Sequence, residues 1–457
     1  MKPMTAAEVA VLAGAGWVQG DAATVIRAVT TDSRAVPAGA LFVALRGDRF
    51  DGHDFVAAAG AAGAAAVLVE AVPAFPPNGM VILQAPDSLA ALQRLAAGVR
   101  RLLDPRVVAV TGSNGKTTTK DFARAVLSSR YAVNATEGNL NNHIGLPLTL
   151  LKQTAGQTHG VFELGMNHPG EVAALAALAA PDIGVITNVG TAHIEYFGTV
   201  EAIAAEKASL LSALRPDGVA VLNLESPMAA VCRARAPGRV VEVGEERGDV
   251  RAGQIRFDKT GAASFTVRAE GASAHVVLPV PGAHMVHNAL LALAVGWIEG
   301  VSIEEGAAAL ASAQLAGGRL TRRVWRGVTL LDDSYNANPD SMVAALQALA
   351  AVAAAGRRIA VLGAMAELGE FAAAGHRRVG RAAAAAHIDV VCTVGAGAAA
   401  IAGEAGAAGV ATESFATHAE CARWLGEVLR PGDVVLVKGS RLSAMEQVLS
   451  HLEEVPS

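Results

Sequence analysis

The segment Val107–Lys120, VVAVTGSNGKTTTK, joins a short apolar run to a glycine-punctuated loop. The apolar run Val107–Val110 is typical of a buried strand, and the loop ends in Gly115, Lys116 and Thr117. Backbone N–H groups of such a loop, with the positive end of the helix that follows, surround phosphate oxygens. Lysine and threonine at this junction reach the outer phosphates and Mg²⁺. We therefore expect a strand, a phosphate loop and a helix, and with them a nucleoside triphosphate site.

The spacing of this loop differs from the common Walker A pattern, in which the first glycine would fall at Val110. The alternative interpretation is a plain glycine-rich turn between a strand and a helix. A Gly-Lys-Thr sequence at the junction makes that alternative weaker than it would be for an isolated Gly-x-Gly. The residues expected to contact the nucleotide phosphates are Gly112, Ser113, Asn114, Gly115, Lys116, Thr117 and Thr118.

The length and charge of the chain limit the classes of protein to which it can belong. At 457 residues it is too long for one hydrophobic core, so two to three domains are expected. The formal net charge of −5, with scattered basic residues, argues against an extended nucleic-acid surface. Cys232, Cys392 and Cys421 have neither disulfide nor zinc spacing. Glu8 interrupts the apolar run near the N-terminus, and no stretch reaches the roughly 18 apolar residues of a membrane span. We expect a short first helix and a cytoplasmic, monomeric protein without nucleic-acid or membrane partners.

Alternating strand-like and helix-like segments predict an α/β protein of three domains. Residues 1–84 form a small α/β unit with strands at Leu41–Leu45 and Ala66–Val69. Residues 85–317 favour a parallel sheet with helices on both faces, as in P-loop ATPases. Residues 318–457 begin a second series after Gly317-Gly318 and predict a Rossmann-like domain. The strands expected in these two units are Val107–Val110, His159–Leu164, Asp182–Thr187, Gly218–Asn223, Val328–Asp332, Arg358–Leu362, Asp389–Val394 and Asp433–Val437.

Two segments depart from this alternation. Residues 253–280 alternate apolar and polar side chains around glycine turns, which predicts an antiparallel hairpin on the side of the central domain. Residues 395–400, GAGAAA, fit the dinucleotide pattern G-x-G-x-x-A after a strand. No acidic residue ends a following strand at the required distance, so we interpret this segment as a tight turn between a strand and a helix.

Single polar residues follow several predicted strands. Glu163 ends the strand that runs beside the phosphate loop, where a carboxylate is placed to hold Mg²⁺; the alternative is an ion-pair residue. His193 follows the next strand and reaches the same edge, although a histidine there is usually a hydrogen-bonding loop residue. Lys207 lies on a predicted amphipathic helix, where a lysine is normally a solvated charge.

Two polar loops are candidates for ligand contacts. The loop GNLNNHIG contains Asn139, Asn141 and Asn142, whose amides suit a polar substrate but also form ordinary turns. The segment DDSYNANPDS at 332–341 follows a predicted strand and puts Asp332, Asp333, Tyr335, Asn336 and Asn338 at the sheet edge where doubly wound domains bind ligands. From it we assign Asp333, Tyr335 and Asn336 to the nucleotide.

A series of motifs resembles the Mur ligase family, and their order and spacing cover essentially the whole chain. They are TDSR at 31–34, TGSNGKTT at 111–118, EGNLNNHIG at 137–145, FELGMNHPGE at 162–171, TAHIEYFG at 191–198, HMVHNAL at 284–290, GGRL at 317–320, DDSYNANP at 332–339 and VLVKGSR at 435–441. Within the family, GNLNNHIG, DDSYNANP, AELGE at 366–370 and KGSRLSAME at 438–446 are similar to the members that add D-alanyl-D-alanine. The DNPR motif of the members that add the third peptide residue is not present.

The resemblance implies roles for single residues of the phosphate and metal site. Lys116 and Thr117 match the phosphate-binding lysine and the Mg²⁺-binding hydroxyl. Glu163 and His193 match metal-associated positions. Lys207 matches the lysine that the family carbamylates, which implies an anionic group near a second Mg²⁺ rather than a solvated cation.

The resemblance also implies roles at the ends of the two substrates. Asn288 matches the adenine-binding asparagine, Arg319 the C-terminal arginine near the γ-phosphate, and Asp333 the acid beside the ribose. Ser33 and Arg34 belong to the uridine-nucleotide region of the N-terminal domain. Two positions depart from the family pattern, since Ala364 stands where aspartate is frequent and Ser209 where glutamate is frequent.

The activity that the resemblance implies is an ATP- and Mg²⁺-dependent ligation of D-alanyl-D-alanine to UDP-N-acetylmuramoyl-tripeptide through an acyl phosphate. It further implies closure of the C-terminal domain over the central one, with Gly317-Gly318 as the hinge. The alternatives are a related ligase that adds another amino acid and a non-catalytic protein that uses ATP as a switch. The third residue of the tripeptide, diaminopimelate or lysine, stays open, as does the order of binding.

Overall fold

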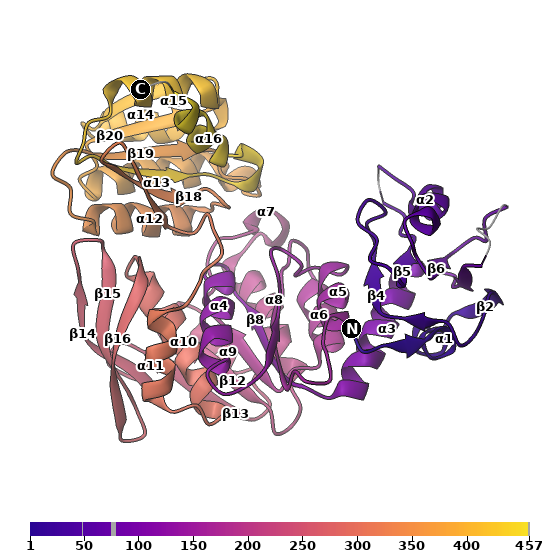
Figure 1. Cartoon of the computed structure of the whole chain (residues 1–457). Coiled ribbons are helices and arrows are strands. Elements are labelled where there is room, and N and C mark those ends of the chain that lie inside the picture. Colours follow the sequence, from indigo (N-terminus) through magenta and orange to yellow (C-terminus); the bar gives the residue numbers. More distant parts are fainter. Residues whose placement is uncertain (48, 75–78, 456–457) are drawn as a thin grey trace.

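The structure is a computed structural model that describes residues 1–47, 49–74 and 79–455. Within them, sheets of five, nine and six strands follow one another along the chain, which confirms the expected three-part α/β architecture (Figure 1). A further pair, β1 (Met4–Thr5) and β3 (Val25–Ile26), forms a small antiparallel ribbon near the N-terminus.

The five-stranded sheet has the order β2-β7-β6-β5-β4, with β2 as an antiparallel edge and the other strands parallel. Both strands predicted in this unit are confirmed, and their side chains are fully buried. The short strand β7 was not predicted, because four residues without a clear period give little signal. The elements of this part are α1 (Ala6–Ala13), β2 (Gly16–Gln19), β4 (Ala28–Thr30), β5 (Ala40–Val43), η1 (Gly52–Phe55), α2 (Val56–Ala61), β6 (Ala66–Val69), β7 (Val81–Gln84) and α3 (Ser88–Leu103).

The helix α3 connects this unit to the next. Asp87 caps its N-terminus by accepting a hydrogen bond from the backbone N–H of Ala90. Basic residues lie in its last turn, where their charge interacts favourably with the negative end of the helix dipole. It packs against α1 on one side and against α5 and α6 of the central unit on the other.

The nine-stranded sheet has the order β16-β15-β14-β13-β12-β11-β8-β10-β9. The strand β8 lies between β11 and β10 and runs parallel to both, and its residues 107–110 are buried as expected. The phosphate loop that follows therefore lies at the carboxyl edge of the sheet, where ligands bind in α/β folds. The elements from β8 to β13 are β8 (Arg106–Thr111), α4 (Lys116–Leu127), β9 (Val133–Ala135), α5 (Gly145–Leu151), β10 (His159–Glu163), α6 (Glu171–Ala179), β11 (Ile183–Ile186), α7 (Ile194–Phe197), α8 (Val200–Ser212), β12 (Val219–Asn223), α9 (Ala229–Arg233) and β13 (Arg239–Gly244).

The antiparallel segment after β13 differs from the predicted hairpin. It has three strands, β14 (Val250–Phe257), β15 (Ala262–Ala269) and β16 (Ala272–Pro281), and β14 continues the central sheet by pairing with β13. We call this segment the meander. The prediction was wrong in strand number because the turn at Glu270 and Gly271 is only two residues long and leaves almost no break in the alternation. The helices α10 (His284–Ile298) and α11 (Ile303–Ala311) follow.

The six-stranded sheet has the order β17-β18-β22-β19-β20-β21, parallel except for the edge strand β17. All four strands predicted here are confirmed, and residues 395–400 form the expected turn into a helix. The elements are β17 (Thr321–Trp325), β18 (Val328–Asp333), α12 (Pro339–Ala351), β19 (Arg358–Gly363), η2 (Gly369–Phe371), α13 (Ala372–Ala385), β20 (Val390–Val394), η3 (Ala396–Ala398), α14 (Ala399–Ala407), β21 (Ala411–Phe415), α15 (His418–Val428), β22 (Val434–Lys438), η4 (Arg441–Ser443) and α16 (Glu446–Glu454).

The C-terminal unit lies above the central one in Figure 1, with α12 on the side that faces it. The turn between β14 and β15 contacts the end of this helix, because the backbone N–H of Ala353 donates to the carbonyl of Lys259 over 2.9 Å. The position of α12 therefore brings the carboxyl edges of two sheets together.

Candidate active site

A cavity of about 1340 Å³ opens between the carboxyl edge of the central sheet and the C-terminal unit. Its walls combine the phosphate loop, the asparagine loop 139–143, the start of α10 and the loop after β18. The predicted site residues that line it are Ser113, Asn114, Gly115, Lys116, Thr117, Thr118, Asn139, Asn141, Asn142, Glu163, His193, Asn288, Arg319, Asp333, Tyr335 and Asn336. Four predicted residues, Gly112, Lys207, Ser33 and Arg34, are not part of its wall.

The first half of the phosphate loop is held by the neighbouring loop after β11. The backbone N–H of Ser113 donates to the carbonyl of Asn188 over 2.9 Å, and that of Asn114 donates to Oδ1 of Asn188 over 3.0 Å. The hydroxyl of Thr187 donates to the carbonyl of Asn114. These bonds fix the loop without a ligand, so its shape is built into the fold.

The second half of the loop supplies the donors for an anion. Gly115 has a φ of 79°, and a Cβ there would lie 2.4 Å from Oδ1 of Asn288, so this position requires glycine. The N–H groups of the first turn of a helix have no partner within the helix, and here they belong to residues 115–118 at the cavity wall. Together with the helix dipole they form an anion site.

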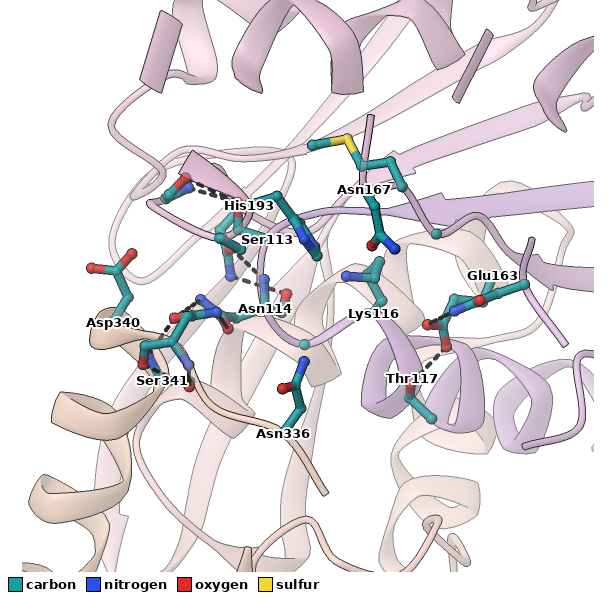
Figure 2. A pocket seen from close by; sticks show the side chains of 18 of the residues that line it. Ser113, Asn114, Lys116, Thr117, Glu163, Asn167, His193, Asn336, Asp340 and Ser341 are labelled. Atoms are coloured by element: carbon teal, nitrogen blue, oxygen red, sulfur yellow. Dashed lines mark hydrogen bonds between the residues drawn. The ribbon is translucent and has the colours of Figure 1, made fainter. Parts of the chain in front are cut away.

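Lys116 lies inside this loop (Figure 2). Its Nζ donates to the carbonyl of Gly112 over 2.8 Å. Burial lowers the pKa of Lys116 below its ordinary value, the Glu163 carboxylate opposes that shift, and Arg319 adds to it. A bound polyphosphate would supply the negative charge that this cation lacks in its surroundings.

Glu163 and Thr117 face each other at the base of the cavity (Figure 2). The hydroxyl of Thr117 donates to Oε2 of Glu163 over 2.6 Å, and Nδ2 of Asn141 donates to Oε1 over 2.8 Å. The predicted carboxylate, hydroxyl and asparagine are thus one contiguous group. Hydroxyl and carboxylate oxygens are the ligand types that Mg²⁺ prefers.

The other two asparagines of the loop differ in their surroundings. The side chain of Asn142 accepts hydrogen bonds from the backbone N–H groups of Ile144 and Gly145, over 3.2 and 2.8 Å, and so supports the start of α5. Asn139 is exposed at the cavity rim. Within this loop, one asparagine orients the carboxylate, one organises the backbone, and one is free to meet a ligand.

His193 contacts a residue of the C-terminal unit. Its Nδ1 lies 2.5 Å from Oε2 of Glu367. Burial lowers the pKa of His193, and the bond to Glu367 opposes that shift. The same bond lowers the pKa of Glu367, against the effect of burial. A histidine held through Nδ1 in this way is oriented for a metal or phosphate on its other nitrogen.

Lys207 is fully buried on α8, at 0% exposure, so its interpretation as a solvated charge is wrong. The helical periodicity of this alanine-rich segment did not reveal that α8 packs against β8 and β11. Among the described residues, its Nζ makes one polar contact, to Sδ of Met166 at 3.6 Å. Burial lowers the pKa of Lys207 well below 10.5, and Lys116 adds to that shift. Met166 lines the cavity, so the amine lies directly behind its wall.

Asn288 is buried at the start of α10, where its Oδ1 accepts a hydrogen bond from the Thr119 hydroxyl over 3.3 Å. One turn before it, burial lowers the pKa of His284 to about 4, and Lys438 and His287 add to the shift. The neutral imidazole of His284 and the amide of Asn288 therefore give this part of the wall uncharged polar groups.

The C-terminal unit contributes cations to the cavity wall, among them Arg319 and Lys438. The guanidinium of Arg319 lies 4.4 Å from the ring centre of Tyr335, and its buried Nε has no hydrogen-bond partner among the residues that the structure describes. Nζ of Lys438 lies 2.7 Å from Oδ2 of Asp333 and donates to the carbonyl of Asn336 over 2.9 Å. Burial raises the pKa of Asp333, and the Lys438 cation opposes that shift.

Ser33 and Arg34 lie far from this wall in the N-terminal unit. The side chain of Arg34 is 87% exposed and pairs with Asp32, with its Nη2 2.8 Å from Oδ2. The two departures from the family pattern have local partners. The Ser209 hydroxyl donates to the Glu206 carbonyl over 2.6 Å, and the Ala364 carbonyl accepts hydrogen bonds from the segment at 440–443.

Residues with direct contacts at the site that were not predicted as site residues include Lys438, Asp340 and Glu367. Lys438 and Glu367 lie within quoted motifs, and that position was a usable signal. Asp340 lies within the segment 332–341 that was singled out as a ligand-binding edge, but it was not selected, because an acidic residue in the first turn of a helix is ordinarily a favourable partner of the helix dipole.

Two searches of the described residues gave negative results. No three His, Cys, Asp or Glu side chains gather closely enough to hold a metal ion by themselves. None of the helices in the described ranges is both long and apolar enough to cross a bilayer.

Comparison with known proteins agrees with the fold and the site. The family model described as "Mur ligase middle domain" matches residues 110–296, "Mur ligase, glutamate ligase domain" matches 318–441, and "Mur ligase family, catalytic domain" matches 25–104. The matches place the phosphate loop in the middle domain and Arg319 in the glutamate ligase domain.

Individual relatives match over nearly their whole length. The UDP-N-acetylmuramoyl-tripeptide--D-alanyl-D-alanine ligase of Mycobacterium tuberculosis is 41% identical, over 93% of this chain and 91% of its own. The enzyme of the same name from Escherichia coli is 39% identical over 96% of both chains. A crystal structure of MurF from Acinetobacter baumannii superposes with a TM-score of 0.91 at 33% identity, covering 99% of each chain. MurF from Thermotoga maritima, solved in complex with ADP, has a TM-score of 0.82 at 30% identity over 94% of this chain and 97% of its own. With three domain matches, full-length relatives and a common fold, this chain belongs to the Mur ligase family.

Proposed function

We propose that this protein is an ATP-dependent amide-bond ligase that joins D-alanyl-D-alanine to UDP-N-acetylmuramoyl-tripeptide in cytoplasmic peptidoglycan precursor synthesis. The observation that carries the proposal is the single cavity in which the phosphate loop, the asparagine loop and the C-terminal cations meet. The full-length relatives named for this activity support the choice of substrates.

The reaction has two steps. The terminal carboxylate of the tripeptide attacks the γ-phosphorus of ATP; a C–O–P bond forms, the bond to the β-phosphate oxygen breaks, and ADP leaves. The amine of D-alanyl-D-alanine then attacks the acyl carbon, forming the C–N bond, losing a proton and expelling inorganic phosphate. In phosphoryl transfer the protein acts mainly by positioning and by stabilising charge.

The residues of this chain have separable roles in that reaction. Lys116 and the N–H groups of residues 115–118 bind the phosphates, and Arg319 approaches the γ-phosphoryl group from the other domain. We assign the adenine to Asn288 and the ribose side to Asp333, Tyr335 and Asn336. The orphaned Nε of Arg319 supports this assignment, because a buried guanidinium donor without a partner requires an acceptor.

Mg²⁺ fits the donor set at the base of the cavity. The Thr117 hydroxyl and the Glu163 carboxylate are 2.6 Å apart, and Mg²⁺ is usually held by one or two carboxylates together with substrate phosphates. These two residues would hold one ion, and His193 and Lys207 would be associated with a second. When bound, the metal would neutralise phosphate charge.

We propose a carbamate on Lys207. A neutral amine attacks CO₂, forms an N–C bond and releases a proton, and the product carries a negative charge. Full burial lowers the pKa of Lys207, which favours the neutral, reactive form of the amine. The remaining assignments are Ser33 and Arg34 to the uridine nucleotide, domain boundaries at residues 84 and 317, and a hinge at Gly317-Gly318.

The test is a panel of amines offered with ATP, Mg²⁺ and the UDP-linked tripeptide, with phosphate release and product mass as readouts. Phosphate should appear only when both the tripeptide and D-alanyl-D-alanine are present. Release with a different amino acid would indicate a related ligase, and release that ignores both acceptors would indicate an ATP switch. Tripeptides that end in diaminopimelate or lysine, run in parallel, identify the third residue.

A further inference from the structure

The N-terminal end of α12 makes a reciprocal contact with the phosphate loop. Nδ2 of Asn338 donates to Oδ1 of Asn114 over 2.8 Å, and Nδ2 of Asn114 lies 3.4 Å from Oδ1 of Asn338. Figure 2 shows this end of the helix, with Asp340 and Ser341, beside Asn114. The two amides belong to different units of the fold and are the complementary halves of one hydrogen-bonded pair.

A second contact lies two residues further along α12. Oδ2 of Asp340 accepts hydrogen bonds from the backbone N–H and the hydroxyl of Thr191, over 2.8 and 2.9 Å. Its Oδ1 pairs with Arg378 on α13 at 2.7 Å. Asp340 is therefore fixed from both sides, by the central unit and by its own unit.

Neither partner of the amide pair is free to move alone. The backbone of Asn114 is bonded to the loop after β11, through Thr187 and Asn188. Asn338 caps α12, because its Oδ1 accepts the backbone N–H of Ser341 over 3.0 Å, and Pro339 fixes the first helical position. A shift of the loop is therefore transmitted to the whole helix.

The helix α12 is in turn connected to Arg319, the cation that we assign to the γ-phosphoryl group. The loop between β18 and α12 contains Tyr335, whose ring packs against the guanidinium of Arg319. The backbone N–H of Leu320 donates to Oδ1 of Asp333 over 3.2 Å, which fixes the chain next to Arg319. The Tyr335 ring contact and the Asp333 hydrogen bond thus connect the start of α12 to Arg319.

We propose that Asn338 and Asp340 are positioning residues for the ligation, which seat the C-terminal domain on the phosphate loop and so place Arg319. The proposal rests on the proposed function. We call the two contacts, Asn114 with Asn338 and Thr191 with Asp340, the α12 seat. Neither Asn338 nor Asp340 has to touch a reacting atom for this role.

The role predicts a specific kinetic pattern. The seat is needed when Arg319 acts on the transferring phosphoryl group, so its loss lowers kcat more than it raises the KM for ATP. One net hydrogen bond corresponds to roughly a three- to tenfold change. A purely structural role would lower the melting temperature and leave kcat per folded molecule unchanged.

The test is Asn338→Ser, alone and combined with Asn114→Ala. Serine still caps the helix, because it is among the preferred N-cap residues, but it is too short to reach Asn114. We expect kcat to fall roughly three- to tenfold with little change in the KM for ATP, and the two changes together to cost no more than the larger single one. Asp340→Asn should lower kcat in the same way. The matched control is Thr417→Ala, which removes the cap of α15 away from the cavity and should leave kcat unchanged.

Solution scattering with ATP analogue and tripeptide bound is the second readout. The Asn338→Ser variant should remain more extended than the wild type under these conditions. Wild-type kcat and wild-type shape in this variant, or fully additive losses in the double variant, would overturn the proposal. A wild type that ligates no amine of the panel would overturn the proposed function instead, and the scattering difference would still decide whether the seat exists.

Discussion

Lys116 and Lys207 are two buried lysines near the same cavity, but their surroundings favour different chemistry. Burial lowers the pKa of both lysines. Lys116 lines the cavity and donates to a backbone carbonyl, with the Glu163 carboxylate nearby. Lys207 lies behind the wall at 0% exposure, and within the described part of the chain its amine contacts the sulfur of Met166. One lysine faces a site for anions, and the other faces none.

The difference teaches what decides the chemistry of a buried amine. A cation stays charged where opposite charges or a polyphosphate can reach it, and it loses its proton where apolar groups surround it. Lys116 is therefore suited to bind phosphate as an ammonium, and Lys207 to react as a neutral amine. The same residue type gives two functions because the packing differs.

Replacing Lys116 is expected to have the largest effect. Lys116→Ala removes the charged donor at the phosphate site and should lower kcat by about 10²- to 10³-fold, the size seen when one charge-stabilising donor is lost. Steady-state phosphate release measures it, and circular dichroism checks the fold. Ligation at the wild-type rate would show that the phosphate loop is assigned wrongly.

Lys207→Ala should lower activity by roughly 10²-fold, because it removes the group that would organise a metal ion. Short carboxylates such as acetate or formate fit the space of a lost carbamate and should restore part of the rate. The same additives should not rescue Lys116→Ala, which serves as the matched control. Wild-type activity in the Lys207 variant would reject the carbamate.

The next effect concerns stability rather than rate. At neutral pH, Lys207→Met should stabilise the fold by about 1–3 kcal/mol in CO₂-free buffer, because an unpaired buried amine is replaced by an apolar group of similar size. Between the lowered pKa of Lys207 in the folded chain and its ordinary value of 10.5, only the unfolded chain binds the proton. The stability of the wild type therefore rises with pH in that window, and the advantage of the variant shrinks.

Urea unfolding of both proteins at about pH 7 and about pH 9 measures this difference. All other groups are common to the two chains, so their contributions cancel. Parallel pH dependences would show that Lys207 keeps its proton in the folded state.

The smallest expected effect is that of Met166→Leu. This change removes the sulfur that accepts from Lys207 and keeps nearly the same volume, so kcat should fall less than about threefold. A small effect on kcat would show that burial, and not the contact with Met166, sets the reactivity of Lys207. A loss as large as that of Lys207→Ala, measured in the same assay, would show that the sulfur holds the amine in place.

The predictable parts of the site share one property: they are local in the sequence. The strand, loop and helix at 107–120 could be recognised because a turn and a helix start use residues that are adjacent in the chain. The strand-end position of Glu163 followed from the rule that carboxyl ends of parallel strands gather at one edge. The motifs at 332–339 and 435–441 indicated the C-terminal edge in the same way.

The features that the sequence did not predict depend on packing between distant segments. The burial of Lys207 could not be inferred from an alanine-rich helix, because alanine fits both faces. The division of roles between Asn141 and Asn142 depends on whether Glu163 or the start of α5 is nearer. The contacts of Asp340 and Glu367 join two domains, and no local pattern encodes them.

The sequence by itself determined the phosphate loop, the alternation of strands and helices in the central and C-terminal units, and the family, because these follow from short-range geometry and from motifs in a fixed order. Only the tertiary structure decided which lysine lines the cavity and which is fully buried behind its wall, which asparagine orients Glu163 and which residues of α12 meet the phosphate loop. Those properties are set by desolvation and by contacts between segments far apart in the chain, and both exist only after the domains have packed.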